Sequence, residues 1–272
     1  LAPTGGYVCG PIVFLAALQG IPACVQEQNA LPGMTNKILA HFVNRIFLGY
    51  SEADKYFKGK AKKIFTGNPI RAEVMQSTRA EGIKAFGLDS GKATVLIAGG
   101  SLGAASVNQA ALQLEKNLSG RDDVQILHAT GKNNYEDYQR QVEELGGFKS
   151  NIHIKPYLYD MPLALAAADI AVFRAGAIGL AELTAKGIPS ILVPFPYATA
   201  NHQEFNARAL EAVGAAQVIL DKNLTGEVLE EKIEHLLLHK EILQKMQNAA
   251  QKAGRPKAAQ EIAKQALALV SK

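Results

Sequence analysis

Between Ala93 and Leu220 the sequence alternates short apolar runs, rich in β-branched residues, with stretches of helical periodicity. Strands that alternate with helices predict βαβ units, which build a parallel sheet with helices on both faces and right-handed crossovers. We therefore predict one complete α/β domain here. The expected strands are Thr94–Ala98, Val124–Ala129, Ile152–Pro156, Ile170–Phe173, Ser190–Pro194 and Gln217–Leu220, and the expected helices are Ala104–Leu114, Tyr135–Leu145, Met161–Ala167, Ile178–Lys186 and Gln203–Val213.

The residues before position 72 show a second, smaller α/β pattern. Its expected strands are Ala23–Gln26, Arg45–Gly49 and Lys63–Thr66, with helices over Gly10–Gln19 and Leu31–Phe42. Three strands bury little surface, and such a half of a Rossmann-like domain usually has a partner half. Since the sequence also begins with Leu1, we expect that it starts inside a domain and lacks roughly 60 to 90 residues of βα units. The predicted fold class is α/β, with two Rossmann-like domains on parallel sheets, the first incomplete.

The charged stretch 76–92 follows Gly67-Asn68-Pro69 and predicts a boundary between the two domains. After Leu220 the pattern is helical, and Gly254 and Pro256 separate the last two helices. We assign residues 1–71 to the first domain, 72–255 to the second, and 256–272 to a C-terminal helix.

Composition excludes several classes of protein. With 48% hydrophobic and 20% charged residues among 272, the chain can fill a core and is neither disordered nor collagen-like. Cys9 and Cys24 are too few for a disulfide scaffold, which indicates a reducing compartment. No apolar run reaches the roughly 18 residues of a transmembrane helix. The formal net charge of +4 permits an anionic substrate or an anionic membrane surface but requires neither.

Two glycine-containing stretches follow expected strands and open expected helices. In Gly99–Gly103 the backbone amides and the helix dipole favour an anion such as a diphosphate, and Ser101 adds a hydroxyl donor. The motif G-x-G-x-x-G is incomplete, so a tight turn without a ligand is the alternative. In Arg174–Glu182 the carboxylate of Glu182 suits the vicinal hydroxyls of a ribose. The equal alternative is a surface partner of the helix dipole.

Polar clusters follow other expected strands. Gln203 and Asn206 lie at i and i+3 on one helix face, and their amides suit a hydroxyl-rich sugar, although a polar first turn explains them as well. The segment Glu27-Gln28-Asn29, with Thr35-Asn36 nearby, indicates either a site or an Asx-rich turn. Arg71, at the domain junction, faces a phosphate across the cleft or is a solvated surface residue.

Several other catalytic motifs are not found. Gly131-Lys132 is not part of a P-loop, the cysteines have no partner at zinc spacing, and G-x-S-x-G does not occur. An NAD-dependent Rossmann enzyme should show G-x-G-x-x-G and an acid about 20 residues further on, which disfavours that class.

Taken in order, the motifs resemble one enzyme family. Thr4–Pro11 is similar to its segment T-G-G-Y-V-S-G-P, and Glu27–Asn36 to E-Q-N-x-x-x-G-x-T-N. Gly67–Arg71 is similar to G-N-P-[VI]-R and Gly99–Ala104 to G-G-S-x-G-A. The family is MurG, the UDP-N-acetylglucosamine:undecaprenyl-diphospho-muramoylpentapeptide N-acetylglucosaminyltransferases of peptidoglycan synthesis. The resemblance runs from Thr4 to the C-terminus, and the four motifs together are specific.

The resemblance implies a GT-B fold with the active site in the cleft between two domains. It implies an inverting transfer of N-acetylglucosamine (GlcNAc) from UDP-GlcNAc to the C4 hydroxyl of the MurNAc unit of lipid I (undecaprenyl-diphospho-MurNAc-pentapeptide), giving lipid II and UDP. It also implies a peripheral protein on the cytoplasmic face of the bacterial plasma membrane. No cofactor, no essential metal and no nucleic acid are expected, since helix N-termini and cations stabilise the departing diphosphate.

The resemblance also assigns roles to residues. Ser101 faces the diphosphate, Arg71 the nucleotide side of the cleft, the Ile178 region the uracil, and Glu182 the ribose. Gln203 and Asn206 hold the GlcNAc. Asn29 lies near the transferred sugar, while Glu27, Asn36 and Asn108 line the cleft. The helix Lys257–Val270 crosses back onto the first domain.

The sequence departs from the family in ways that matter for catalysis. The family's glycine-rich loop G-G-T-G-G-H, whose His is the usual general base, has no match here. The catalytic residue is therefore unassigned, with Glu27 and Asn29 as candidates, and we expect the chain to bind UDP without turnover. Gln26 and Gly179 replace a frequent His and a frequent Thr. For the apolar residues Ile12, Phe14 and Leu18, a remnant of a membrane-docking patch is possible, but we expect burial in the core.

Two readings besides the MurG reaction stay open. Another GT-B glycosyltransferase is one, which the Glu27–Asn36 cluster disfavours. A non-catalytic nucleotide-sugar binding fragment is the other, and the missing base loop favours it.

Overall fold

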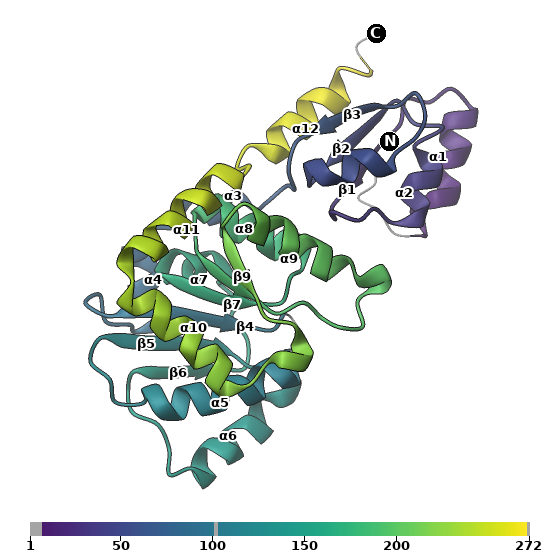
Figure 1. Cartoon of the computed structure of the whole chain (residues 1–272). Coiled ribbons are helices and arrows are strands. Elements are labelled where there is room, and N and C mark those ends of the chain that lie inside the picture. Colours follow the sequence, from purple (N-terminus) through teal and green to yellow (C-terminus); the bar gives the residue numbers. More distant parts are fainter. Residues whose placement is uncertain (1–6, 101–102, 271–272) are drawn as a thin grey trace.

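The computed structural model describes residues 7–100 and 103–270, which form two α/β units (Figure 1). We name residues 7–66 the first unit and residues 72–253 the second unit. The chain passes between them twice, at 67–71 and again after Ala253.

The first unit is a small parallel sheet with helices beside it. In the described residues its order is β1 (Cys24–Glu27), β2 (Arg45–Leu48) and β3 (Lys62–Phe65), all parallel. Helices α1 (Cys9–Leu18) and α2 (Met34–Leu39) and the 3₁₀ helix η1 (Ser51–Tyr56) connect and cover the strands. The sheet contributes the buried side chains of Val25, Ile46 and Leu48 to the core. Val13 of α1 and Leu39 of α2 belong to the same apolar cluster.

The second unit contains a larger sheet, which is parallel throughout its described residues. Its strand order is β6-β5-β4-β7-β8-β9. Sequential strands thus run outward from β4 to one edge and from β7 to the other. This is the doubly wound order, in which ligands bind beyond the carboxyl ends of the two central strands. The strands are β4 (Ala93–Ala98), β5 (Val124–Ala129), β6 (Ile152–Lys155), β7 (Ile170–Phe173), β8 (Ser190–Leu192) and β9 (Ala216–Val218).

Helices cover both faces of this sheet, and each face has its own apolar core. Alternate residues of β4 divide between them, so Leu96 faces one core while Val95 and Ile97 face the other. The helices of this unit are α3 (Ala72–Gln76), α4 (Arg79–Phe86), α5 (Ala105–Leu118), α6 (Tyr135–Glu144), α7 (Met161–Ala167), α8 (Ala177–Lys186), α9 (His202–Ala212), α10 (Gly226–Leu238) and α11 (Lys240–Ala253), with 3₁₀ turns at η2 (Lys132–Asn134), η3 (Thr199–Asn201) and η4 (Asp221–Asn223). Helix α12 (Ala258–Leu267) follows beyond this unit. The predicted α/β class with parallel sheets is confirmed.

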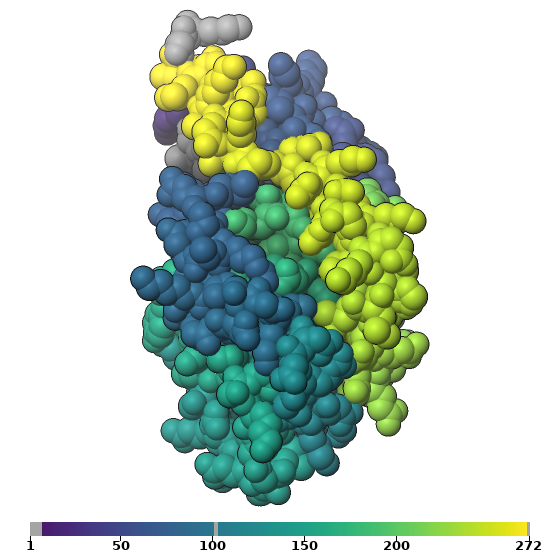
Figure 2. Space-filling model, turned by 90° about the vertical axis from the view of Figure 1, so that its left-hand side faces the viewer, coloured from purple at the N-terminus to yellow at the C-terminus, as the bar shows by residue number. Residues whose placement is uncertain are grey.

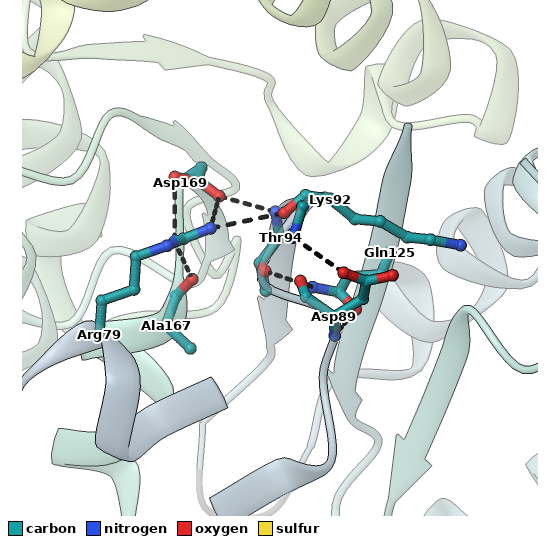
Figure 3. A network of polar contacts seen from close by, with 8 residues as sticks. Arg79, Asp89, Lys92, Thr94, Gln125, Ala167 and Asp169 are labelled. Carbon is teal, nitrogen blue, oxygen red and sulfur yellow. Dashed lines mark hydrogen bonds and ion pairs between the residues drawn. The ribbon is translucent and has the colours of Figure 1, made fainter. Parts of the chain in front are cut away.

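A polar network fixes the amino ends of the central strands, opposite the ligand-binding edge (Figure 3). Arg79 of α4 donates to both carboxylate oxygens of Asp169, at 3.0 and 3.1 Å, and to the carbonyl of Ala167. Asp169 in turn accepts from the amide of Thr94 at 2.8 Å. A bidentate Arg–carboxylate pair is geometrically specific, so it ties α4 to the start of both β4 and β7.

The C-terminal segment lies over both units (Figure 2). Helix α11 packs on α8 of the second unit, and α12 reaches the first unit, where Arg45 of β2 donates to the carbonyl of Gln265. Gly67 and Arg255 meet where the chain crosses. Gly67 has a φ of +79°, and a Cβ at that position would lie 2.3 Å from the Cβ of Arg255. Only glycine fits there.

The expected burial of Ile12, Phe14 and Leu18 is wrong. Their exposed fractions are 61%, 36% and 63%, and Phe14 packs edge-to-face on Phe42. Helix α1 is apolar on all sides, whereas the adjoining sheet covers one side of it, and Val13 is the residue of α1 that becomes buried. None of the described helices is long and apolar enough to cross a bilayer.

Candidate active site

A cavity of 690 Å³ lies at the carboxyl ends of the central strands of the second unit. Three segments, each following a strand, form most of its wall: the glycine turn after β4, the stretch Arg174–Glu182 after β7, and residues 195–203 after β8. The reversal of strand order between β4 and β7 leaves room at this edge. The sequence predicted all three segments as site elements.

The turn after β4 brings the start of α5 to the cavity wall. Gly103 has a φ of +78°, and a Cβ there would lie 2.1 Å from the carbonyl oxygen of Thr130. Gly99, Gly100 and Gly103 line the cavity. Ser101 lies outside the described residues, so its contact with a diphosphate stays a prediction.

Glu182 lines the cavity from the second turn of α8 and is 6% exposed. Arg71 reaches it from the interunit crossing, and its Nε donates to Oε1 of Glu182 at 3.0 Å. The two predicted site residues thus contact each other. The pair joins the crossing segment to the cavity wall. A ribose contact by Glu182 and a phosphate contact by Arg71 both stay predictions.

Gln203 and Asn206 lie on the same helix but have different surroundings. Gln203 lines the cavity, and its Oε1 accepts from the amide of Phe195 at 3.0 Å. Asn206 is completely buried and faces the first unit. Its Nδ2 donates to Oδ1 of Asn29 at 3.0 Å, and its Oδ1 accepts from the amide of Ala30 at 2.8 Å. In this conformation Asn206 joins the two units and does not line the cavity.

The polar cluster of the first unit is organised around Glu27, which is 2% exposed. One carboxylate oxygen accepts from the amide of Asn29 at 2.9 Å. The other accepts from the amide of Gly33 at 3.1 Å and from Nδ2 of Asn36 at 2.8 Å. Protein donors thus surround this carboxylate, which folds the loop after β1 back on itself.

Two further predicted residues lie beside the cavity wall. Asn108 of α5 is buried, donates to the carbonyl of Thr130 at 2.9 Å and contacts Nε2 of His128 at 3.2 Å. It therefore connects α5 to the end of β5. Ile178 is partly exposed, and its neighbours Gly176 and Gly179 line the cavity.

The structure adds an arginine network that sequence reasoning did not single out. Arg174 bonds Oδ1 of Asp221 at 2.5 Å through Nη1 and donates to Oγ of Ser106 at 2.7 Å through Nη2. Its Nε is buried and has no hydrogen-bond partner among the described residues. An Arg directly after a buried strand was the available signal. Tyr157, Leu158, Met161, Phe195 and Tyr197 supply apolar and aromatic wall.

Known proteins match this chain along almost its whole length. Residues 94–262 match the glycosyltransferase family 28 C-terminal domain, and residues 1–48 match the N-terminal domain. A UDP-N-acetylglucosamine–N-acetylmuramyl-(pentapeptide) pyrophosphoryl-undecaprenol N-acetylglucosamine transferase of Desulforamulus reducens is 47% identical over 264 residues, 96% of this chain and 71% of that protein. The protein of the same name from Acetivibrio thermocellus is 48% identical over 92% of this chain and 68% of its own length.

Solved structures agree with these sequence matches. MurG of Acinetobacter baumannii superposes with a TM-score of 0.77 at 29% identity, over 96% of this chain and 71% of that one. A UDP-GlcNAc 2-epimerase of Neisseria meningitidis shares the fold, with a TM-score of 0.73 at 16% identity, over 97% of this chain and 74% of that one. The level of identity and the shared GT-B fold show that the chain belongs to the MurG family of glycosyltransferases.

Proposed function

We propose that this chain binds UDP-GlcNAc in the 690 Å³ cavity, and that the reaction this cavity serves is the inverting transfer of GlcNAc to the C4 hydroxyl of MurNAc in lipid I, giving lipid II and UDP. The observation that carries the proposal is the meeting of the glycine turn, Glu182 and Gln203 at one cavity. That cavity lies where doubly wound sheets bind nucleotides.

The cavity offers one kind of contact for each part of the donor. Backbone amides at the start of α5, with Ser101, take the diphosphate. The carboxylate of Glu182 takes the ribose hydroxyls, and the backbone around Ile178 takes the uracil. Gln203 takes the C4 hydroxyl of GlcNAc. Asn206 acts through the first unit, because its amide holds Asn29 and Ala30 in place.

Two arginines supply positive charge near the leaving group. Arg174 has a buried Nε without a partner among the described residues, in the cavity wall, and Arg71 bonds the lining residue Glu182 from outside that wall. Fixed donors and cations aimed at developing negative charge stabilise a transition state at little reorganisation cost. We infer that Arg174 faces the departing diphosphate, with Ser106 and Asp221 fixing its guanidinium.

We further infer a division of labour. Residues 1–71 serve the acceptor and the membrane, residues 72–255 bind the nucleotide sugar, and residues 256–272 hold the units together. The location that we infer is peripheral, on the cytoplasmic face of the plasma membrane. The exposed side of α1 carries the apolar residues Ile12, Leu15 and Leu18, which supports contact with a membrane. A group of exposed apolar side chains offers a contact surface for a membrane.

The general base is the open part of the mechanism. The carboxylate oxygens of Glu27 accept hydrogen bonds from protein donors, and Asn29 has no basic side chain, so neither fits the role of the general base. We propose that a polypeptide of residues 1–272 binds UDP without sugar transfer. This feature also favours the second candidate function, a nucleotide-sugar binding unit without turnover.

One comparison separates the two candidate functions. UDP binding is measured by isothermal titration, and lipid I conversion by product analysis, for residues 1–272 and for Gln203→Ala. We expect both proteins to bind UDP. We expect the unchanged protein to prefer UDP-GlcNAc to UDP-GalNAc, and the Gln203→Ala variant to show no such preference. General-base help is worth about 10²–10⁴-fold in rate. Turnover at the rate of a full-length relative would place the base within these residues, and absence of UDP binding would overturn both functions.

A further inference from the structure

A second cavity, of 570 Å³, lies between the two units on the other side of helix α8. Gly179 and Glu182 of α8 line the active-site cavity, whereas Ala181 and Thr184 line this one. We name it the hinge cavity, because Gly67 and Arg255 line it where the chain crosses between the units. Its volume is typical of small-molecule sites, which often occur at domain interfaces.

The inner wall of the hinge cavity is apolar. Leu180 and Leu210 form its buried part, and Val213 and Phe65 continue it outward with 53% and 41% of their surface exposed. Exposed apolar side chains that line a cavity gain free energy when an apolar group covers them.

Cations surround this apolar wall. Lys245 and Lys252 of α11 and Arg255 line the cavity, against the single carboxylate of Glu52 among its described lining residues. The guanidinium of Arg255 lies 4.9 Å from the ring centre of Phe65, so its charge is held at the edge of the apolar wall. A positive rim around an apolar wall complements a ligand with an apolar body and one negative group.

We propose that the hinge cavity binds a small amphipathic anion, and that its occupancy changes the affinity of the active site for UDP. The shared helix α8 and the crossing at Gly67 and Arg255 are the contacts through which the two sites are coupled. Coupling of this kind is reciprocal, so UDP must change the anion's affinity by the same factor. The coupling rests on the proposed nucleotide site, whereas the anion binding does not.

A matched pair of fluorescent probes tests the binding. Anilinonaphthalenesulfonate has an apolar body and one sulfonate, and phenylnaphthylamine is the same body without the charge. Val213→Trp fills the cavity from an exposed position, and the double variant Lys245→Gln/Lys252→Gln removes two exposed rim cations. Lys240→Gln is the control, since Lys240 is exposed on α11 outside the cavity lining.

Each variant has an expected result. Val213→Trp should remove one class of binding sites for both probes. The double lysine variant should weaken sulfonate binding by about three- to tenfold, the effect of two exposed ion pairs, and leave the neutral probe unchanged. Lys240→Gln should bind like the unchanged protein. Sulfonate binding that survives Val213→Trp, or an equal loss for both probes in the lysine variant, would overturn the site.

The coupling is tested by titrating UDP with and without saturating sulfonate probe. We expect the affinity for UDP to change at least threefold, and the change to disappear in Val213→Trp. Unchanged UDP affinity with intact probe binding would overturn the coupling alone, and loss of UDP binding in every protein would point instead to failure of the proposed function.

Discussion

Two buried glutamates of this molecule lie near the carboxyl ends of parallel strands but have different surroundings. Glu27 is the last residue of β1, and Glu182 lies in the second turn of α8, the helix that follows β7. Both carboxylates are buried, at 2% and 6% exposure. Glu27 accepts hydrogen bonds from Asn29 and Gly33 of the loop after β1 and from Asn36 of α2. Glu182 lines a 690 Å³ cavity and is held by Arg71.

The difference separates a carboxylate that holds a loop together from one that lines an open cavity, where we propose that it binds a ligand. Burial alone does not distinguish them, because both are shielded from solvent. What distinguishes them is the identity of the donors around the oxygens: protein amides in one case, and in the other an arginine and an open cavity. The predictions below test this distinction from the largest expected effect to the smallest.

Replacing Glu27 with Ala should lower the free energy of unfolding by about 3 kcal/mol. The loop donors lose a charged acceptor, and hydrogen bonds to charged groups are worth about 1.5–3 kcal/mol, more when the donors stay buried. Urea unfolding followed by circular dichroism measures the loss, and UDP affinity should stay within about twofold of the unchanged protein. A weaker UDP complex at unchanged stability would show instead that Glu27 serves the ligand.

Replacing Glu182 with Ala should weaken UDP binding by about 1–3 kcal/mol, because ribose hydroxyls in a cleft lose their acceptor. Isothermal titration measures the affinity, and Glu227→Ala, an exposed carboxylate on α10, is the matched control. Equal affinity for UDP in Glu182→Ala and the unchanged protein would restrict Glu182 to holding Arg71.

The sequence predicted most of the strands and helices because strand and helix periods are local properties. The predicted ends of all six strands of the second unit lie within two residues of the observed ones, and the largest differences are at the carboxyl ends of β8 and β9, which were predicted two residues too long. Helix α4 was missed, since the stretch 76–92 was interpreted as a charged boundary. Its signal was present as a capping box, in which Thr78 and Glu81 bond each other's backbone amides.

The candidate site was predicted less completely, for a physical reason. Local spacing placed Glu182 and Gln203 at the cavity edge, but which way Asn206 and Asn108 face depends on segments far away in sequence. Asn206 meets Asn29 across the interunit contact, and Asn108 meets His128 on β5. The exposure of Ile12 and Leu18 likewise depends on how much of α1 the neighbouring sheet covers. The helical periodicity of the sequence carries no information about that coverage.

Replacing Asn206 with Ala should separate interunit contact from ligand contact. The amides of Ala30 and Asn29 lose a buried partner, which we expect to cost about 1–2 kcal/mol of stability. If Asn206 acts through the first unit, UDP affinity should change little while the loop after β1 becomes more accessible to limited proteolysis. A marked loss of UDP-GlcNAc affinity, with UDP affinity and stability intact, would return Asn206 to the sugar site.

The smallest expected effect is a pH dependence confined to the second unit. His153 lies on β6, and burial, together with the nearby charges of Lys155 and Lys92, lowers its pKa from the ordinary value of 6.5. The folded chain therefore favours neutral His153, while the unfolded chain takes up a proton as the pH falls through about 6.5. The stability contribution of His153 is complete above that pH and is lost as the pH falls toward the lowered pKa.

Unfolding free energies at pH 7.5 and 5.5 test this for the unchanged protein and for His153→Gln. The variant should lose less stability on acidification, because glutamine does not titrate. Glu27→Ala serves as the comparison, since its defect lies in the first unit and should leave the histidine contribution intact. Equal losses in the unchanged protein and His153→Gln would assign the acid sensitivity to other groups. A reduced loss in His153→Gln, together with an undiminished one in Glu27→Ala, would assign the acid sensitivity to the second unit.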